Sequence, residues 1–138
     1  GVEVLAVAGH RRPLERRLRQ LAGGHPHVHP FGFTDRMPTL MAAADVVVAL
    51  PGATTCNEAR VLGRELVLLD LMPGHGRDNL QHELDLGHAH VAGRTGEEIA
   101  TAVLHALGSA DGCPQVRPDP DAWSTAFSSA LASVGVAV

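Results

Sequence analysis

The sequence has no lysine, only two cysteines and no long apolar run, and each absence excludes a class of protein. Without about 20 consecutive apolar residues, there is no candidate for a membrane-spanning helix. Cys56 and Cys113 lie far apart and lack the pattern of a disulfide-rich scaffold, so we expect reduced thiols in the cytoplasm. All eleven basic residues are arginine, which we interpret as compositional bias rather than as a sign of phosphate recognition.

Charge and composition exclude further classes. Fifteen acidic and eleven basic residues give a net charge of -4 with the nine histidines neutral, so there is no basic surface for nucleic acid. The apolar fraction of 45% and the charged fraction of 19% are typical of globular rather than disordered chains. At 138 residues, the chain is long enough for one domain with a core of its own.

The common catalytic and metal-binding motifs are also missing. The sequence contains no H-E-x-x-H or C-x-x-C, no G-x-S-x-G elbow, and neither a Walker loop nor G-x-G-x-x-G. His25, His27 and His29 alternate as they would on one face of a strand, but no cysteine or carboxylate lies beside them in the sequence. We therefore expect no bound metal.

The sequence instead contains short apolar runs that alternate with helical patterns. The expected strands are Val2–Ala8, His27–Phe31, Val46–Leu50, Leu66–Leu71 and His88–Val91. The expected helices are Pro13–Leu21, Met37–Ala44, Thr55–Leu62, Asn79–Leu86 and Glu97–Leu107. Nearly continuous apolar runs are typical of parallel strands covered on both faces. The alternation therefore predicts an α/β fold with a Rossmann-like, doubly wound parallel sheet.

Residues that end helices support this division of the chain. Gly63 and Gly87 follow helical patterns where a left-handed residue is favoured, and Thr95 with Glu98 has the spacing of a capping box. We expect three parts: an α/β domain over residues 1–108, a Gly- and Pro-containing linker over 109–118, and a helix over 119–138. That helix would pack on this domain or on a partner. Because the chain opens directly on a strand-like run, we expect a piece of a longer protein or a subunit that needs another.

In open parallel sheets, ligands bind beyond the carboxyl ends of the strands, and the loop after the third strand is the most informative. Unpaired amides at residues 52–55 and the positive end of the helix dipole favour an anion. Gly52 and Ala53 would let a diphosphate approach the backbone. Thr54 and Thr55 would add hydroxyl donors, and Glu58 could accept both hydroxyls of a ribose. The alternative is structural, with Thr55 and Glu58 forming a capping box.

Two further loops carry polar candidates. The loop after the fourth strand has four side chains suited to a sugar or a phosphate: His75, Arg77, Asp78 and Asn79. The structural alternative there is a solvated loop with Asp78 as the N-cap of the helix. After the first strand, Gly9 allows a tight turn, and Arg11 or Arg12 could neutralise phosphate.

Five sequence blocks resemble the carboxyl-terminal domain of GT-B-fold glycosyltransferases of the family 28 type, which includes peptidoglycan N-acetylglucosaminyltransferase and diacylglycerol glycosyltransferases. They are FGFTDRM at 31–37, AADVVV at 43–48, PGATTCNEA at 51–59, LGRELVL at 62–68 and PGHGRDN at 73–79. The resemblance extends from about Phe31 to Leu107. The chain departs from lipid-glycosylating members at His75 and Gly76, where these members typically have Gln-Glu, and at Arg64, where the family usually has proline.

The resemblance implies one half of a GT-B fold that binds a nucleotide-sugar donor, a UDP-hexose, with no cofactor and no nucleotide-held metal. The loop containing Phe33, Thr34 and Met37 would contact the uracil, residues 52–55 the diphosphate, Glu58 the ribose, and residues 74–79 the sugar. The acceptor and usually the catalytic base belong to an amino-terminal half, so the catalytic residue is unknown and the chain alone should be inactive. Any membrane contact would be made by that other half.

The sequence leaves three alternatives open. The chain could be the donor-binding subunit of a split, membrane-associated glycosyltransferase. It could be a UDP-sugar epimerase, whose fold would be similar. It could also be a non-catalytic interaction module that uses the apolar stripe Trp123–Leu131 as its partner surface.

Overall fold

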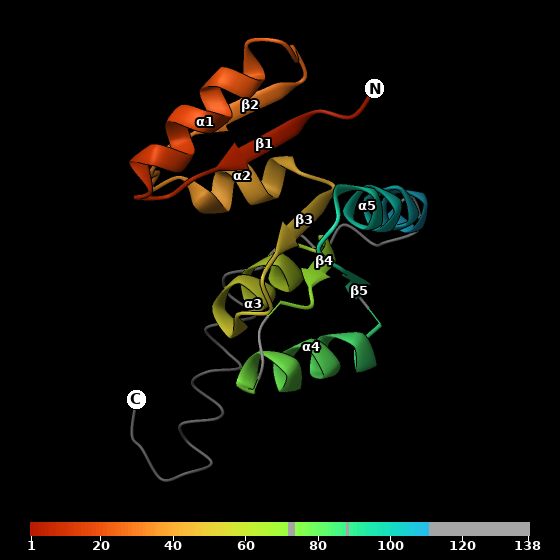
Figure 1. Ribbon diagram of the computed structural model, residues 1–138. Helices are drawn as coiled ribbons and strands as arrows, with labels where there is room; N and C mark the ends of the chain where they lie inside the picture. The colour runs from red at the N-terminus through yellow and green to blue at the C-terminus, as the bar shows by residue number, and fades with distance from the viewer. Residues whose placement is uncertain (72–73, 88, 111–138) are drawn as a thin grey trace, which may run out of the picture. The chain divides into compact units, whose positions relative to one another are not determined.

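The computed structural model describes residues 1–71, 74–87 and 89–110, with only the backbone of His75 and Ala110 (Figure 1). The predicted helix over 119–138 and most of the predicted linker lie outside these ranges. The chain divides into two compact units, Gly1–Ala44 and Asp45–Val138. Within the described ranges, no helix combines the length and the hydropathy needed to cross a membrane.

The first unit is a strand–helix–strand–helix segment. Its elements are β1 (Val4–Val7), α1 (Arg12–Ala22), β2 (Val28–Phe31) and α2 (Met37–Ala43). The two strands pair in parallel, with Val4 opposite Val28. Helix α1 packs on β2 so closely that a Cβ atom at Gly32 would lie 2.7 Å from the Glu15 carboxylate. Glycine leaves room for this carboxylate, and a larger residue after β2 would require the flexible end of Glu15 to move.

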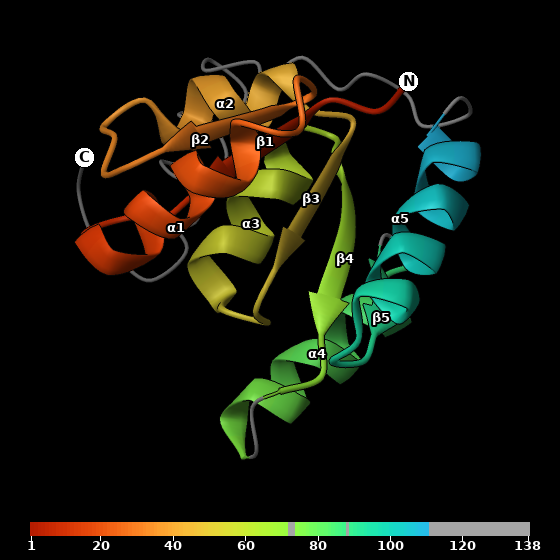
Figure 2. The same cartoon turned by 45° about the horizontal axis from the view of Figure 1, so that its top comes forward.

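The second unit contains a three-stranded parallel sheet with helices on both faces. Its elements are β3 (Val46–Ala49), α3 (Ala53–Val61), β4 (Glu65–Leu69), α4 (His75–Asp85), β5 (Ala89–Ala92) and α5 (Gly96–Ala110). The strand order is β3-β4-β5, and Val46 pairs with Glu65 as Leu66 pairs with Ala89. Figure 2 shows α3 and α5 on opposite sides of this sheet. The predicted parallel α/β fold is confirmed, with its strands in two sheets.

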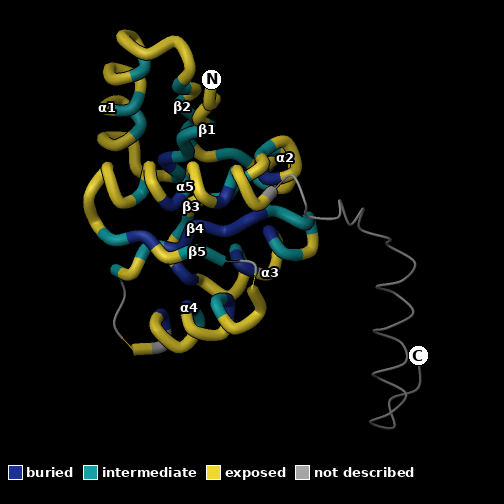
Figure 3. The backbone as a smooth tube through the Cα atoms, turned by 90° about the vertical axis from the view of Figure 1, so that its right-hand side faces the viewer, coloured by how far each residue is buried: buried dark blue, intermediate teal, exposed yellow. Residues whose placement is uncertain are grey.

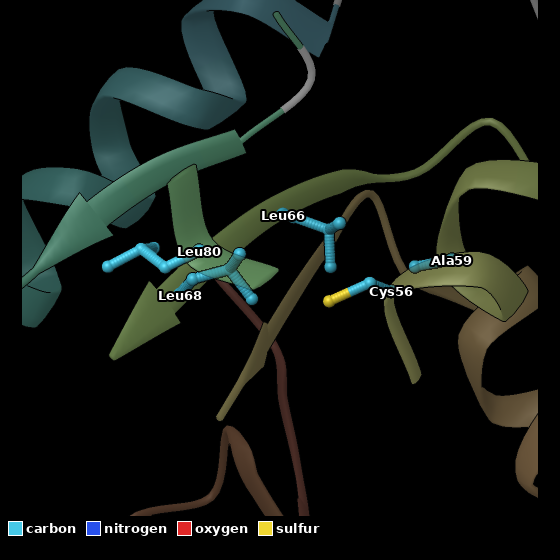
Figure 4. Packing of buried hydrophobic residues seen from close by; sticks show 5 residues of the cluster. All are labelled: Cys56, Ala59, Leu66, Leu68 and Leu80. Carbon is cyan, nitrogen blue, oxygen red and sulfur yellow. The ribbon is translucent and has the colours of Figure 1, made fainter. Parts of the chain in front are cut away.

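The core of the second unit surrounds β4, the most deeply buried strand (Figure 3). Alternate residues of a strand face opposite sides, so β4 contributes to two separate clusters. On one face, Leu66 and Leu68 pack with Cys56, Ala59 and Leu80 from α3 and α4 (Figure 4). On the other face, Val67 packs with three alanines, Ala92, Ala102 and Ala106. This two-sided burial explains the apolar run at 66–69.

The two predicted left-handed glycines after helices and the capping box are confirmed. Gly63 and Gly87 have φ values of 64° and 77°, the left-handed conformation expected after a helix. Before α5, the Thr95 amide donates to Glu98 Oε2 at 2.9 Å, and the Glu98 amide donates to Thr95 Oγ1 at 3.2 Å. Helix α5 continues to Ala110, three residues beyond the predicted Leu107.

Two helices start at least two residues earlier than predicted. Helix α3 begins at Ala53 rather than Thr55, and α4 begins at His75 rather than Asn79. A helix is predicted from the spacing of its buried apolar residues. The first buried side chains are Cys56 in α3 and Leu80 in α4, so the turns before them give no such signal. The first turn of each helix is therefore set by the backbone at its N-cap glycine and not by burial.

Candidate functional site

The strongest candidate site in the second unit lies beyond the carboxyl ends of β3 and β4, where α3 and α4 begin (Figure 2). Leu50, Pro51 and Gly52 form the turn between β3 and α3. The Gly52 amide donates to the Leu50 carbonyl at 2.7 Å, and Pro51 is fully buried. Gly52 is the N-cap of α3 with φ -92° and ψ 131°, and it has no side chain to cap the helix.

Three successive amides at the start of α3 are unpaired. The first helical hydrogen bond runs from the Cys56 amide to the Gly52 carbonyl, at 3.0 Å. The amides of Ala53, Thr54 and Thr55 therefore have no acceptor among the residues that the structure describes. The Gly52 amide is already paired, so the expectation of free amides over 52–55 is wrong at its first position. The remaining three amides, with the helix dipole behind them, suit an anion.

Glu58 lies on α3 one helical turn after these amides. Glu58 is exposed, and no hydrogen bond or ion pair joins its carboxylate to any other part of the described chain. The alternative of a capping box with Thr55 is wrong, because Thr55 is the third residue of the helix and Gly52 is its N-cap. Glu58 is thus an unpaired acceptor beside an unpaired set of donors.

The first turns of α4 lie against the same loop. Asn79 Nδ2 donates to the Pro51 carbonyl at 3.1 Å, which joins the two predicted loops directly. Arg77 Nη2 lies 3.7 Å from Asp70 Oδ2, with the Arg77 side chain largely in solvent and the Asp70 side chain less exposed. Asp78 is exposed within the helix and is not its N-cap, because that position belongs to Gly74. His75 is the first helical residue, and its side chain lies outside the described part.

The predicted residues of the first unit also gather at strand ends. Gly9 has φ 58° in the turn after β1, and Arg11 is exposed immediately before α1. Phe33, which is 65% exposed, stacks on His10 with ring centroids 3.9 Å apart. Two further predicted residues lie nearby in sequence: Thr34, whose Oγ1 accepts from the Arg36 amide, and Met37, the first residue of α2.

Sequence reasoning missed His10. It lies in the loop after β1, and its partner Phe33 lies in the loop after β2. The carboxyl ends of neighbouring parallel strands lie at the same edge of a sheet, so pairing of the first two strands was the signal that could have found this stack. The result is an exposed aromatic platform in the first unit.

The match that decides the family covers most of the chain. Residues 1–108 match the model of the glycosyltransferase family 28 C-terminal domain. The chain belongs to glycosyltransferase family 28. The match includes every described strand of this family 28 domain and all of α5 except its last two residues.

The family 28 domain is similar to several glycosyltransferases of lipids. It is 30% identical to the processive diacylglycerol beta-glucosyltransferase of Bacillus subtilis (strain 168). The aligned 111 residues are 80% of this chain and 29% of that protein. The corresponding protein of Bacillus pumilus (strain SAFR-032) is 29% identical over 107 residues, 77% of this chain and 28% of its own length. A protein of Oryza sativa subsp. japonica named "Probable monogalactosyldiacylglycerol synthase 3, chloroplastic" is 27% identical over 77% of the chain and 20% of its own length. The chain thus spans less than a third of these relatives.

A partly buried ion pair connects the two helices of the site in the family 28 domain. Arg60 Nη1 on α3 donates to both carboxylate oxygens of Glu83 on α4, at 3.0 and 3.2 Å, and Arg60 also contacts Asn57. Glu83 is only 3% exposed. The sequence contained no signal for the pair of Arg60 and Glu83.

Cys56, on α3, lies in the hydrophobic core and not in the loop before the helix. Burial raises the pKa of its thiol, and the nearby Glu83 carboxylate adds a smaller effect in the same direction.

The histidine run of the family 28 domain has a carboxylate partner from a neighbouring strand. Parallel pairing of β1 and β2 brings Glu3 beside His27 and His29, with distances of 2.8 and 2.7 Å to their ring nitrogens. Hydrogen bonds from both rings lower the pKa of Glu3. Over the described ranges, no group of three or more His, Cys, Asp or Glu residues has a geometry that could hold a metal ion.

Proposed function

We propose that the family 28 domain binds a nucleotide-sugar donor, a UDP-hexose, and that the complete enzyme transfers the hexosyl group to a lipid acceptor of the diacylglycerol class. One observation carries the donor site: the three unpaired amides at residues 53–55 are followed by the unpaired carboxylate of Glu58. A diphosphate needs donors, and the adjoining ribose needs an acceptor for its hydroxyls. The start of α3 offers both in that order.

In this proposal, the diphosphate lies at the amino end of α3. The amides of Ala53, Thr54 and Thr55, the Thr54 and Thr55 hydroxyls and the helix dipole would stabilise the charge that grows on the leaving nucleotide during transfer. Glu58 follows Thr55 by three residues, which is about 4.5 Å along a helix axis. That separation suits a ribose joined to the diphosphate. Neither cofactor nor metal is required by this arrangement.

The base and the sugar of the donor are assigned to the other predicted loops. Within the first unit, the exposed Phe33–His10 stack offers the aromatic face from which a flat base gains, and the family resemblance implies that this loop contacts the uracil. The segments that follow β1 and β2 also contain the other predicted residues of the first unit: Gly9, Arg11, Thr34 and Met37. The hexose is assigned to the first turns of α4, the segment that contains His75, Arg77 and Asp78.

The acceptor and the catalytic base are assigned to a separate amino-terminal half. The relatives are named for transfer to diacylglycerol, and this chain covers only part of their length. We expect the complete enzyme to work in the cytoplasm and to meet the membrane through that other half. The family 28 domain alone should therefore bind the donor without transferring its sugar.

Isothermal titration calorimetry of the 138-residue chain with UDP, GDP and ADP tests the donor site. We expect heat of binding with UDP, and weaker or no binding with the two purine nucleotides. Failure of all three to bind, in a sample whose thermal unfolding is cooperative, would contradict the proposal. Equal binding of all three would retain the diphosphate site and remove the assignment of uracil.

A further inference from the structure

The peptide group between Pro51 and Gly52 is held at both ends. Asn79 Nδ2 donates to its carbonyl oxygen at 3.1 Å, and its N–H donates to the Leu50 carbonyl at 2.7 Å. A trans peptide is planar, so its C=O and N–H point in opposite directions. Two hydrogen bonds on opposite sides therefore fix the orientation of this plane.

Such a plane would otherwise turn easily. The ring of Pro51 locks its φ, which leaves ψ of Pro51 and φ of Gly52 as the two torsions that rotate the peptide. Glycine tolerates nearly the whole range of φ, so Gly52 would not resist rotation. Its N-cap position also has no side-chain hydrogen bond to the helix. Among the described residues, Asn79 is the only group that donates to the Pro51 carbonyl.

Asn79 is itself fixed by the residues that follow it on α4. Leu80, the next residue, is 6% exposed in the cluster beneath β4, and Glu83, one turn on, is paired with Arg60 of α3. The amide of Asn79 therefore extends from a helix that is anchored to the sheet and to α3. Its hydrogen bond joins the start of α4 to the turn that precedes the three unpaired amides.

We propose that Asn79 is a positioning residue of the donor site, which acts through the Pro51 carbonyl on the amides of residues 53–55. Holding that carbonyl towards α4 keeps an oxygen away from the anion and presents the next three amides without reorganisation on binding. This role rests on the proposed donor function. It also differs from the role that the family resemblance implies, in which residues 74–79 reach the sugar.

The first test asks, without a ligand, whether the hydrogen bond from Asn79 restrains the Pro51–Gly52 peptide. In the Asn79→Ala chain, amide exchange of Gly52 measured by NMR should become at least severalfold faster, because its peptide is free to rotate. The matched control is Gln81→Ala, which removes an exposed amide from the same helix; within the described part of the chain, Gln81 donates only to Asp85. The control should leave Gly52 exchange unchanged. Unchanged Gly52 exchange in Asn79→Ala would overturn the inference while leaving the donor site intact.

The second test compares UDP, UDP-glucose and UMP by calorimetry on the same chains. Asn79→Ala should weaken UDP and UDP-glucose by the same factor, about tenfold, as expected for one hydrogen bond that orders a charged site, and should weaken UMP less. A loss confined to UDP-glucose would overturn the inference, because it would show that Asn79 acts on the sugar. Equal losses for all three ligands would overturn it as well.

A volume-matched variant covers the case in which alanine disturbs folding. Asn79→Leu keeps the size of the side chain and removes its donor, so it should reproduce the ligand pattern of Asn79→Ala with a melting temperature near that of the unmodified chain. Normal UDP binding by this variant would overturn the inference. Absence of UDP binding by the unmodified chain would instead overturn the proposed function, and the role of Asn79 with it.

Discussion

Arg60 and Glu83 form a two-oxygen ion pair, at 3.0 and 3.2 Å, between the two helices that carry the candidate site. The Glu83 side chain is almost completely buried, whereas about a third of Arg60 reaches solvent. A charge in this position depends on its partner, because the protein interior replaces the water that would otherwise solvate it. The pair therefore sets how α3 and α4 are held together beneath the loops.

Arg60→Ala should destabilise the chain by about 3 kcal/mol, because Glu83 would remain buried without its partner. Urea unfolding followed by circular dichroism measures the change. The control is Arg19→Ala, which breaks the exposed pair with Glu15 and should cost less than about 1 kcal/mol. The double variant Arg60→Met with Glu83→Leu should recover much of the lost stability. Equal effects of the two arginine substitutions would contradict the importance of burial.

Glu58→Ala should weaken UDP binding by about 1–3 kcal/mol, because the ribose hydroxyls would lose a charged acceptor. The melting temperature should stay unchanged, since the Glu58 carboxylate has no partner elsewhere in the described structure. Calorimetry and a thermal scan on the same sample measure both. Glu97→Ala, in the first turn of α5, removes another exposed carboxylate and should leave the UDP affinity unchanged. A lowered melting temperature with unchanged affinity would assign Glu58 a structural role.

Thr95→Ala should destabilise α5 by about 1 kcal/mol, because the Glu98 amide would lose its cap. Denaturant unfolding at pH 7 measures the loss. Thr101→Ala, an exposed substitution in the same helix outside the capping box, is the control and should change stability by only a few tenths of a kcal/mol. Equal losses from the two variants would contradict the capping interaction.

The contribution of Glu98 should depend on pH. Hydrogen bonds from the backbone and hydroxyl of Thr95 hold the pKa of Glu98 below its ordinary value of 4.5. A lowered folded-state pKa stabilises the fold above the ordinary value, and this contribution is lost as the pH falls through the lowered pKa. The stability difference between the unmodified chain and Glu98→Gln should therefore shrink on acidification from pH 7 to pH 3. A difference that is constant over this range would contradict the shift.

The Cys56 thiol should resist alkylation in the folded protein. It is completely buried in the cluster that it forms with Leu66 and Leu68 of β4. Burial also raises the pKa of the thiol, so the reagent reaches it poorly and little of it is thiolate. Iodoacetamide at pH 8, followed by peptide mass spectrometry, should leave the Cys56 peptide unmodified unless urea is added. Rapid labelling without urea would show that α3 opens from the sheet.

The sequence predicted the parallel strands because the apolar run around Leu66–Leu69 is covered on both faces, which leaves no polar alternation. It missed the true starts of α3 and α4 because Ala53 and His75 begin turns without apolar periodicity. It also missed contacts made across strands or helices. The pairs Glu3–His27 and Asn79–Pro51 join residues more than twenty positions apart, and only strand pairing and helix placement bring them together.

The strand order β3-β4-β5 has a consequence for how the second unit is assembled. Every pairing joins strands that are consecutive in the chain, so each one closes a loop containing a single helix. Such loops cost little entropy compared with distant crossovers, and contacts between nearby segments form quickly. During synthesis, β4 can dock on β3 before β5 has left the ribosome, and the sheet can then grow one strand at a time.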